Sequence, residues 1–244
     1  MSQGLIITFS GIDGAGKSTQ IELLMARLRE QGRRPISVWT RGGYTPLFEK
    51  LKTVWRRLAG RAVPPSGNNP QRTQALNKGW VRRLWLVLAL LDLIRVYGMQ
   101  VRWWRWRGRD VVCDRYLWDT LIDFRLNFPQ EAFERWWLWR WLVKVTPQTD
   151  AAFLLLVPVQ DSLRRSEIKG EPFRDSPEVL AQRSARYQAL AQDGRWHMMD
   201  GLRPISELEA EILAEVTKFF GRGSGPRQSH CEGAQCPKQS PSQG

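Results

Sequence analysis

The stretch Gly11-Ile12-Asp13-Gly14-Ala15-Gly16-Lys17-Ser18-Thr19 decides the fold of this sequence. Its spacing of glycine, lysine and serine matches the phosphate-binding loop pattern G-x-x-x-x-G-K-[ST]. An apolar, β-branched run over residues 5–10 precedes the loop, and apolar residues recur at helical spacing after it as far as Gly32. Such a loop needs a strand before it and a helix after it, because the turn then directs backbone N–H groups at phosphate oxygens. The stretch therefore predicts a binding site for a nucleoside triphosphate.

The side chains at the end of this loop have separate chemical tasks. The Lys17 amine can reach the outer phosphates, and the Ser18 hydroxyl can bind Mg²⁺. The residues expected to hold the phosphates are Gly11, Asp13, Gly14, Ala15, Gly16, Lys17, Ser18 and Thr19. The alternative is a glycine-rich turn with a chance Lys-Ser pair, which the flanking strand and helix disfavour.

The composition agrees with one domain and indicates anionic partners. The 244 residues suffice for one large α/β domain. A net charge of +13 predicts partners among phosphate ligands, nucleic acids or acidic membrane surfaces. Only three cysteines occur, so no disulfide framework is expected. No basic and apolar leader precedes the first strand, and the best candidate for a membrane span, residues 84–96, is interrupted by Asp92 and Arg95. We therefore expect a cytoplasmic location.

Hydrophobic periodicity predicts five strands that alternate with helices. The strands are expected over residues 5–10, 35–40, 110–113, 151–157 and 196–199. The helices after the first one are expected over residues 45–58, 72–99, 117–127, 130–145, 160–168, 177–192 and 205–220. This alternation is typical of an α/β fold in three layers, the P-loop NTPase fold, with a five-stranded parallel sheet and helices on both faces. The domain is expected to cover residues 1–220, and residues 221–244 lack the apolar content to fold and are expected to form a disordered tail.

Polar side chains follow several of these strands. Arg41 follows the second strand, Asp114 and Arg115 follow the third, and Asp200 ends the last. Ligands of open α/β sheets bind at the carboxyl ends of the strands. The sequence thus predicts one crevice that contains the phosphate-binding loop and these side chains, although Arg115 and Arg41 could also be ordinary surface arginines.

Five patterns occur in order along residues 5–220. They are residues 9–20 around the loop, T-R-G-G-Y-T-P-L at 40–47, V-V-C-D-R-Y at 111–116, the basic segment 162–174 and M-D-G at 199–201. In this order and spacing they resemble the thymidylate kinase family of P-loop nucleoside-monophosphate kinases. The first and third patterns are specific together, whereas each of the others alone is weak.

The resemblance implies transfer of the γ-phosphoryl group of ATP to a nucleoside monophosphate, with dTMP as the first acceptor to consider. Such chemistry needs mainly positioning and cations around the transferred group. The resemblance implies that Ser18 and Asp114 bind Mg²⁺, that Arg115 and Arg41 hold the acceptor phosphate, and that Asp13 faces the acceptor sugar or the metal.

A lid over about residues 164–176 is the second implication of the resemblance. Ala15 stands where some members of the family have an arginine, so the lid is expected to supply the missing catalytic cation beside Lys17 and Arg115. The candidates are Lys169 and Arg174, with Arg165 behind them. Lys169 replaces an expected arginine.

The acceptor side departs from the pattern of the family. Residues 90–93 read Leu-Leu-Asp-Leu where the family has an arginine that frames the base, and only Arg95 lies nearby. The positions after Asp114-Arg115-Tyr116 that face the base in the family are Asp119, Thr120 and Asp123 here, of which Thr120 is the expected acceptor contact. Another nucleotide, a nucleoside or a sugar is therefore the alternative acceptor. Further along, Arg183 and Arg186 are expected to be solvated, with a position of Arg183 facing the site as the alternative.

Tryptophan and arginine alternate in two segments, R-W-W-R-W-R at 102–107 and R-W-W-L-W-R-W at 135–141. Helix packing with extended arginines, together with contacts in a homodimer, is the first interpretation. An interfacial membrane patch is the next, and would make the chain a membrane-docked nucleotide-binding protein. A base-stacking surface for nucleic acid comes last.

Overall fold

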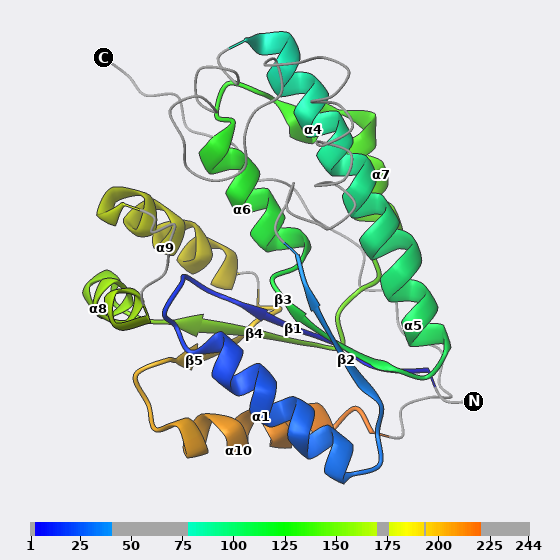
Figure 1. The fold of residues 1–244 in the computed structure, drawn as a ribbon, viewed down its shortest axis with the longest axis vertical. Helices are drawn as coiled ribbons and strands as arrows, with labels where there is room; N and C mark the ends of the chain where they lie inside the picture. The colour runs from blue at the N-terminus through cyan, green and yellow to red at the C-terminus, as the bar shows by residue number, and fades with distance from the viewer. Residues whose placement is uncertain (1–2, 41–77, 170–175, 193, 221–244) are drawn as a thin grey trace.

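A computed structural model describes residues 3–40, 78–169, 176–192 and 194–220 of the chain. Its centre is a sheet of five parallel strands in the order β2-β3-β1-β4-β5 (Figure 1). The strands are β1 (Ile6–Ser10), β2 (Pro35–Trp39), β3 (Asp110–Asp114), β4 (Ala151–Leu156) and β5 (His197–Asp200). The α/β fold with a five-stranded parallel sheet that the sequence predicts is confirmed.

Helices cover both faces of this sheet (Figure 1). Helices α1 (Lys17–Glu30) and α10 (Ile205–Thr217) pack against each other on one face. The other face carries α4 (Gly79–Leu93), α5 (Arg102–Trp106), α6 (Leu117–Asn127) and α7 (Trp137–Val145). Helices α8 (Val159–Lys169) and α9 (Pro177–Ala191) follow β4, and α9 packs against both β4 and α6.

The central strand is buried on both faces, which explains its unbroken apolar sequence. Ile6 of β1 packs into the core under α4 and α7, whereas Ile7 and Phe9 pack into the core under α1 and α10. All three side chains are fully buried. Because parallel strands under two helical layers bury both faces, they read as continuous apolar runs rather than alternating ones.

The long helix predicted to end near residue 99 continues to Trp106, through a π-helical segment over Ile94–Val101. Its inner side is core: Tyr97 is fully buried, and its hydroxyl lies 2.6 Å from the Thr40 hydroxyl. Within the described residues, Gly79–Trp106 is the one helix long and apolar enough to cross a membrane, and 56% of its most apolar window is buried inside the protein. Burial of this kind is also typical of core helices.

A single helix over residues 130–145 is wrong. The structure has a 3₁₀ turn at Phe133–Arg135 and then α7, separated by Trp136 in an extended conformation. The break turns two rings inward, because Phe133 and Trp139 meet edge to face with 5.2 Å between their centroids. Burial of both aromatic side chains therefore outweighs the continuity of one helix.

Candidate active site

The phosphate-binding loop joins the end of β1 to the start of α1, at the carboxyl edge of the sheet. Gly14 and Gly16 have positive φ angles of 75° and 92°, a conformation that other residues adopt only at a cost. Gly11 is restricted by its neighbour as well, because a Cβ atom there would lie 2.2 Å from the Leu155 carbonyl oxygen. The loop thus needs glycine for both its turns and its contact with β4.

Lys17 lies buried at the base of this loop. Its Nζ atom donates hydrogen bonds to the carbonyl oxygens of Gly11 at 3.0 Å and Ile12 at 2.8 Å. Burial lowers the pKa of Lys17, and the nearby Arg115 lowers it further. The amine is therefore a desolvated cation held beside the loop, where it can meet an anion at short range.

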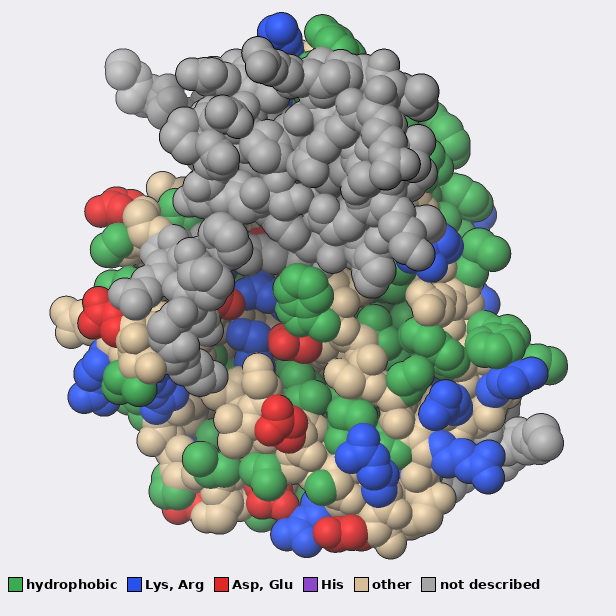
Figure 2. Space-filling view, in the orientation of Figure 1, with side chains coloured by type: hydrophobic (Ala, Val, Ile, Leu, Met, Phe, Trp, Pro, Cys, Tyr) green, Lys and Arg blue, Asp and Glu red, His purple; other side chains and the backbone are tan. Residues whose placement is uncertain are grey.

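A cavity of about 170 Å³ opens between the loop and the ends of β2 and β3. Its lining residues are Asp13, Gly14, Gly16, Lys17, Ser18, Trp39, Asp114 and Arg115. Figure 2 shows basic and acidic side chains gathered in a hollow near the centre of that face. Strands β1 and β3 are neighbours, but the chain leaves β1 toward β2 on one side and leaves β3 toward β4 on the other. Open α/β sheets bind ligands at such a topological switch point.

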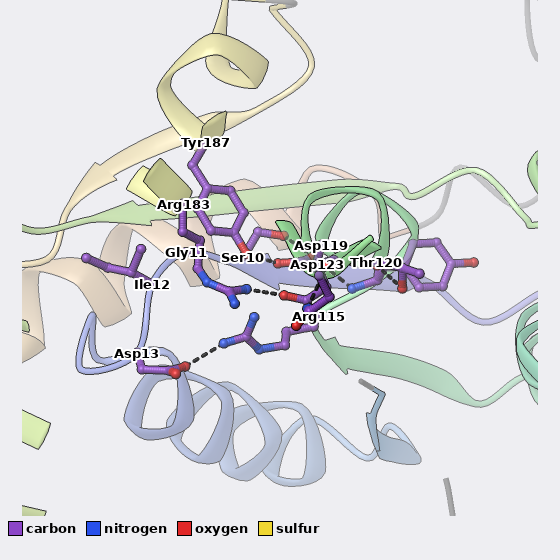
Figure 3. Close-up of polar contacts among 12 residues, drawn as sticks. Ser10, Gly11, Ile12, Asp13, Arg115, Asp119, Thr120, Asp123, Arg183 and Tyr187 are labelled. Carbon is purple, nitrogen blue, oxygen red and sulfur yellow. Dashed lines mark hydrogen bonds and ion pairs between the residues drawn. The ribbon is translucent and has the colours of Figure 1, made fainter. Parts of the chain in front are cut away.

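Arg115 lines the same cavity as Lys17. It has a φ angle of 70°, which is uncommon for a residue with a side chain, and only 3% of its surface is exposed. Its Nη2 atom donates a hydrogen bond to Asp13 Oδ1 at 2.5 Å (Figure 3), whereas its Nη1 atom is buried without a partner in the described part of the chain. Burial acts to lower the pKa of Arg115, but nearby groups, first Tyr187 and Asp13, raise it well above the ordinary value. Arg115 is thus a permanent cation with one donor group available to a ligand.

Asp114 offers the complementary group. Its Oδ1 atom is buried at the cavity and has no hydrogen-bond partner among the described residues. The exposed Ser18 hydroxyl lines the same cavity. A carboxylate oxygen without a donor and a hydroxyl oxygen are ligands of the kind that Mg²⁺ prefers, so the residues present fit this ion.

A buried polar network lies behind Arg115 (Figure 3). Asp119 accepts hydrogen bonds from Ser10 Oγ at 2.6 Å, from the Tyr116 backbone N–H at 2.8 Å and from the Tyr187 hydroxyl at 2.5 Å. Burial nonetheless raises the pKa of Asp119. The network ties the end of β1, the start of α6 and α9 together around one carboxyl group.

The same helices are joined by a second buried contact, an ion pair between Arg183 and Asp123. The prediction that Arg183 is solvated is wrong, because 1% of its side chain is exposed and it points at α6 (Figure 3). The reason is the acid at position 123: a buried carboxylate needs a cationic partner, and Arg183 supplies it. Neighbouring Arg186 is half-buried.

The structure brings several of the predicted site residues to one cavity and leaves others elsewhere. Seven of them line it: Asp13, Gly14, Gly16, Lys17, Ser18, Asp114 and Arg115. Gly11 and Ala15 are buried within the loop, and Thr19 is exposed on the first turn of α1. Thr120 lies in the interior instead, where its hydroxyl is 3.4 Å from that of Tyr97. Arg41 and Arg174 lie outside the described residues, as does the side chain of Lys169 at the end of α8.

Two residues of the site, Trp39 and Ser162, were not predicted from the sequence. Trp39 lines the cavity and is 53% exposed, and its position at the end of β2 was the available signal. Ser162 donates to the Asp13 carbonyl oxygen at 2.6 Å. Arg165, predicted as a cation behind Lys169 and Arg174, donates from Nη1 to the carbonyl oxygens of Gly14 and Gly201, which joins the loop to the end of β5. No sequence pattern indicates such contacts to backbone carbonyls.

Comparison with known proteins shows where this site belongs. The family model for thymidylate kinase matches residues 100–212. A thymidylate kinase of Thermomicrobium roseum is 33% identical over 228 residues, covering 89% of this chain and 96% of that relative. The chain belongs to the thymidylate kinase family. A thymidylate kinase of Deinococcus radiodurans is 29% identical over 234 residues, covering 89% of this chain and 98% of that relative.

Membership of this family makes the chain a phosphotransferase with a P-loop kinase fold. A solved structure of deoxyadenosine kinase from M. mycoides, described as binding the products dCMP and dCDP, has a similar fold with a TM-score of 0.53. The similarity covers 88% of this chain and 100% of that one at 12% sequence identity. ATP is the phosphoryl donor of the family, and a nucleotide acceptor is its second substrate.

Proposed function

We propose that this protein is an ATP-dependent nucleoside-monophosphate kinase that converts dTMP and ATP to dTDP and ADP. One observation supports this most strongly: a single cavity is lined both by the phosphate-binding loop with Lys17 and by the buried Arg115, which has a donor group available. Two cations that line one cavity suit two phosphate groups that must meet. Family membership supplies the reaction class and the acceptor.

The donor side follows from the loop. The backbone amides from Gly11 to Thr19 and the Lys17 amine bind the phosphates of ATP, and Ser18 and Asp114 bind Mg²⁺. Mg²⁺, when bound, neutralises charge on the phosphates and orients them. Lys17 serves the transition state in the same way, because it places a cation where negative charge spreads over the transferred group.

The acceptor side follows from Arg115. Its guanidinium group, together with that of Arg41, matches the oxygens of the acceptor phosphate, and Asp13 sets the orientation of Arg115 through their hydrogen bond. Lys169 and Arg174 in the lid over about residues 164–176 bring the remaining cations when the lid closes. Thr120 is the proposed side-chain contact to the rest of the acceptor; in the structure its hydroxyl lies 3.4 Å from that of Tyr97.

A different acceptor is the second candidate, on the basis of the network behind Arg115. Asp119 and Asp123, at positions that face the base in the family, are engaged by Tyr187 and Arg183. The region that would recognise thymine is thus built from a buried acid and an ion pair. Another nucleotide, a nucleoside or a sugar phosphorylated at the same Arg115 is the alternative substrate.

The proposal extends to the organisation of the protein. Residues 1–220 form the kinase domain, residues 221–244 a disordered tail, and the enzyme acts in the cytoplasm. Formation of a homodimer and peripheral contact with a membrane are the two surface interactions that the tryptophan-rich helices suggest.

A coupled assay of ADP release tests the acceptor. The full chain is supplied with MgATP and in turn with dTMP, the other nucleoside monophosphates, thymidine and simple sugars. Turnover that depends on dTMP, and is lost in Lys17→Ala but kept in Arg29→Ala, supports the proposal; Arg29 is exposed at the far end of α1 and is the matched control. Turnover with a nucleoside or a sugar alone selects the second candidate.

A further inference from the structure

Helices α5 and α7 present indole rings and basic side chains together on the outside of the molecule. Met99, Trp103 and Trp106 follow one another at helical spacing along one stripe and are 67%, 48% and 68% exposed. Trp137 and Trp141 form a second stripe on α7, 67% and 44% exposed, with ring centroids 6.3 Å apart. Helix α7 packs alongside the π-helical segment that leads into α5, so the stripes are neighbours. Together with the basic residues beside them, these side chains form the Trp/Arg face.

The charge of this face has one sign. Residues 93–109 contain five basic residues and residues 135–149 contain three, and neither segment contains an acidic residue. Arg102, Arg107, Arg140 and Lys144 are exposed beside the tryptophans. Arg107 lies over the Trp103 ring at 4.3 Å from its centroid, which keeps an indole and a cation together at the surface. Figure 2 shows hydrophobic and basic side chains side by side along the right-hand edge, where Figure 1 places α5.

The inner side of the same helices is fixed in the core. Leu138 and Leu142 of α7 and Tyr97 and Val101 of the long helix are buried. These helices therefore cannot leave the domain to cross a bilayer without unfolding it, and only their outer side is available to a partner. A surface of tryptophan, methionine and arginine on a fixed helix pair is the composition of a protein that lies in a membrane interface, where indoles favour the headgroup level and arginines favour anionic lipids.

Two other partners fit this face less well. A two-fold homodimer through it would pair this basic, acid-free surface with a second copy of itself, and like charges repel. Nucleic acid needs a cationic groove that follows its backbone, and within the described residues the face is the outside of two adjacent helices that also exposes Met99 and Val143. We infer that the Trp/Arg face docks this protein onto an anionic lipid bilayer. This inference goes beyond the proposed kinase activity and does not depend on it.

The position of the face keeps the cavity accessible in the docked state. Helix α5 ends beside the amino ends of the strands, where the Gly4 backbone N–H donates to the Arg105 carbonyl oxygen at 2.9 Å. The cavity lies at the carboxyl ends (Figure 1). Nucleotides can therefore enter and leave while the opposite side of the protein rests on the lipid.

Vesicle co-sedimentation tests the inference. The full chain is mixed at low salt with vesicles of phosphatidylcholine alone and of phosphatidylcholine with about one third phosphatidylglycerol. Binding to the anionic vesicles that is weakened by salt, together with quenching of tryptophan fluorescence by brominated lipid, is the expected result. Arg140→Ser/Lys144→Ser should weaken this binding about thirtyfold, and Trp106→Ser/Trp137→Ser should weaken both the binding and the quenching that depends on vesicles.

Matched variants make the test specific. Arg29→Ser/Lys218→Ser removes the same charge from exposed positions on α1 and at the end of α10, and should keep at least about half of the affinity. The inference is overturned if anionic vesicles do not bind at low salt, or if both pairs of variants lose affinity equally. It is also overturned if a single-stranded oligonucleotide binds the face while vesicles do not, or if light scattering shows a dimer that Trp106→Ser/Trp137→Ser dissociates. ADP release in solution is unchanged in these variants, so failure here is distinct from failure of the kinase proposal.

Discussion

The ion pair between Arg183 and Asp123 gives the strongest stability prediction. We expect Arg183→Met to destabilise the domain by about 3–5 kcal/mol, because it leaves a buried carboxylate without its cation. The structural basis is burial, since 1% of the Arg183 side chain and 6% of the Asp123 side chain are exposed. For a domain of this size the loss corresponds to a decrease in melting temperature of about 10 °C.

A double-mutant cycle separates the pair from the packing of the two side chains. Asp123→Leu added to Arg183→Met removes the uncompensated charge, so the double variant should recover at least about 2 kcal/mol of the free energy of unfolding. Urea unfolding followed by circular dichroism measures the wild type, Arg183→Met, Asp123→Leu and the double variant. Arg186→Met, one residue from Tyr187 on the same helix but half-buried, is the control and should change stability by less than about 1 kcal/mol. A loss below about 1 kcal/mol in Arg183→Met, or no recovery in the double variant, would refute the reasoning.

Four further predictions concern the loop and Arg115. Lys17→Met should reduce kcat by at least about a hundredfold. Its melting temperature without nucleotide should stay equal or rise, because a buried cation is removed. A lower melting temperature would contradict this. Folding lowers the pKa of Lys17 from its ordinary value of 10.5. Below the folded pKa the buried amine is charged and lowers the free energy of unfolding, and this penalty disappears as the pH rises toward 10.5. In urea unfolding, the wild type should therefore gain stability relative to Lys17→Met over the alkaline range. Arg115→Lys should raise KM for the acceptor and lower kcat by about a hundredfold with KM for ATP nearly unchanged, whereas an equal rise in both KM values would place Arg115 elsewhere. Gly11→Ala should cost about 2 kcal/mol or more, since its Cβ atom would lie 2.2 Å from the Leu155 carbonyl oxygen; wild-type stability in thermal unfolding would count against that contact.

The sequence was sufficient to predict the parallel sheet and the phosphate-binding loop, which is one half of the site. Strands such as β4 are continuous apolar runs in the sequence. The glycines of the loop have the spacing of a phosphate-binding turn, so both features can be recognised in the sequence. Arg115 directly follows a predicted strand, so its position at the carboxyl edge of the sheet could be predicted. Its positive φ angle and its hydrogen bond to Asp13 depend on tertiary contacts and could not.

The network behind Arg115 could not be predicted for a different reason. Arg183 lies sixty residues from Asp123 in the sequence, and a helical arginine among polar residues has the pattern of a solvated one. Only the packing of α9 against α6 decides that its side chain is buried. The break at Trp136 is similar, because the burial of Phe133 and Trp139 in one aromatic cluster is a property of the core and not of local helix propensity.

Product analysis of a single turnover tests the central claim most directly. Phosphorus NMR follows the γ-phosphate of MgATP in the presence of the full chain and dTMP. We expect the γ-phosphate to appear as the β-phosphate of dTDP in the wild type and to remain on ATP in Lys17→Ala. ATP that stays intact with dTMP and every other nucleoside monophosphate, in a folded wild-type protein, would contradict the account.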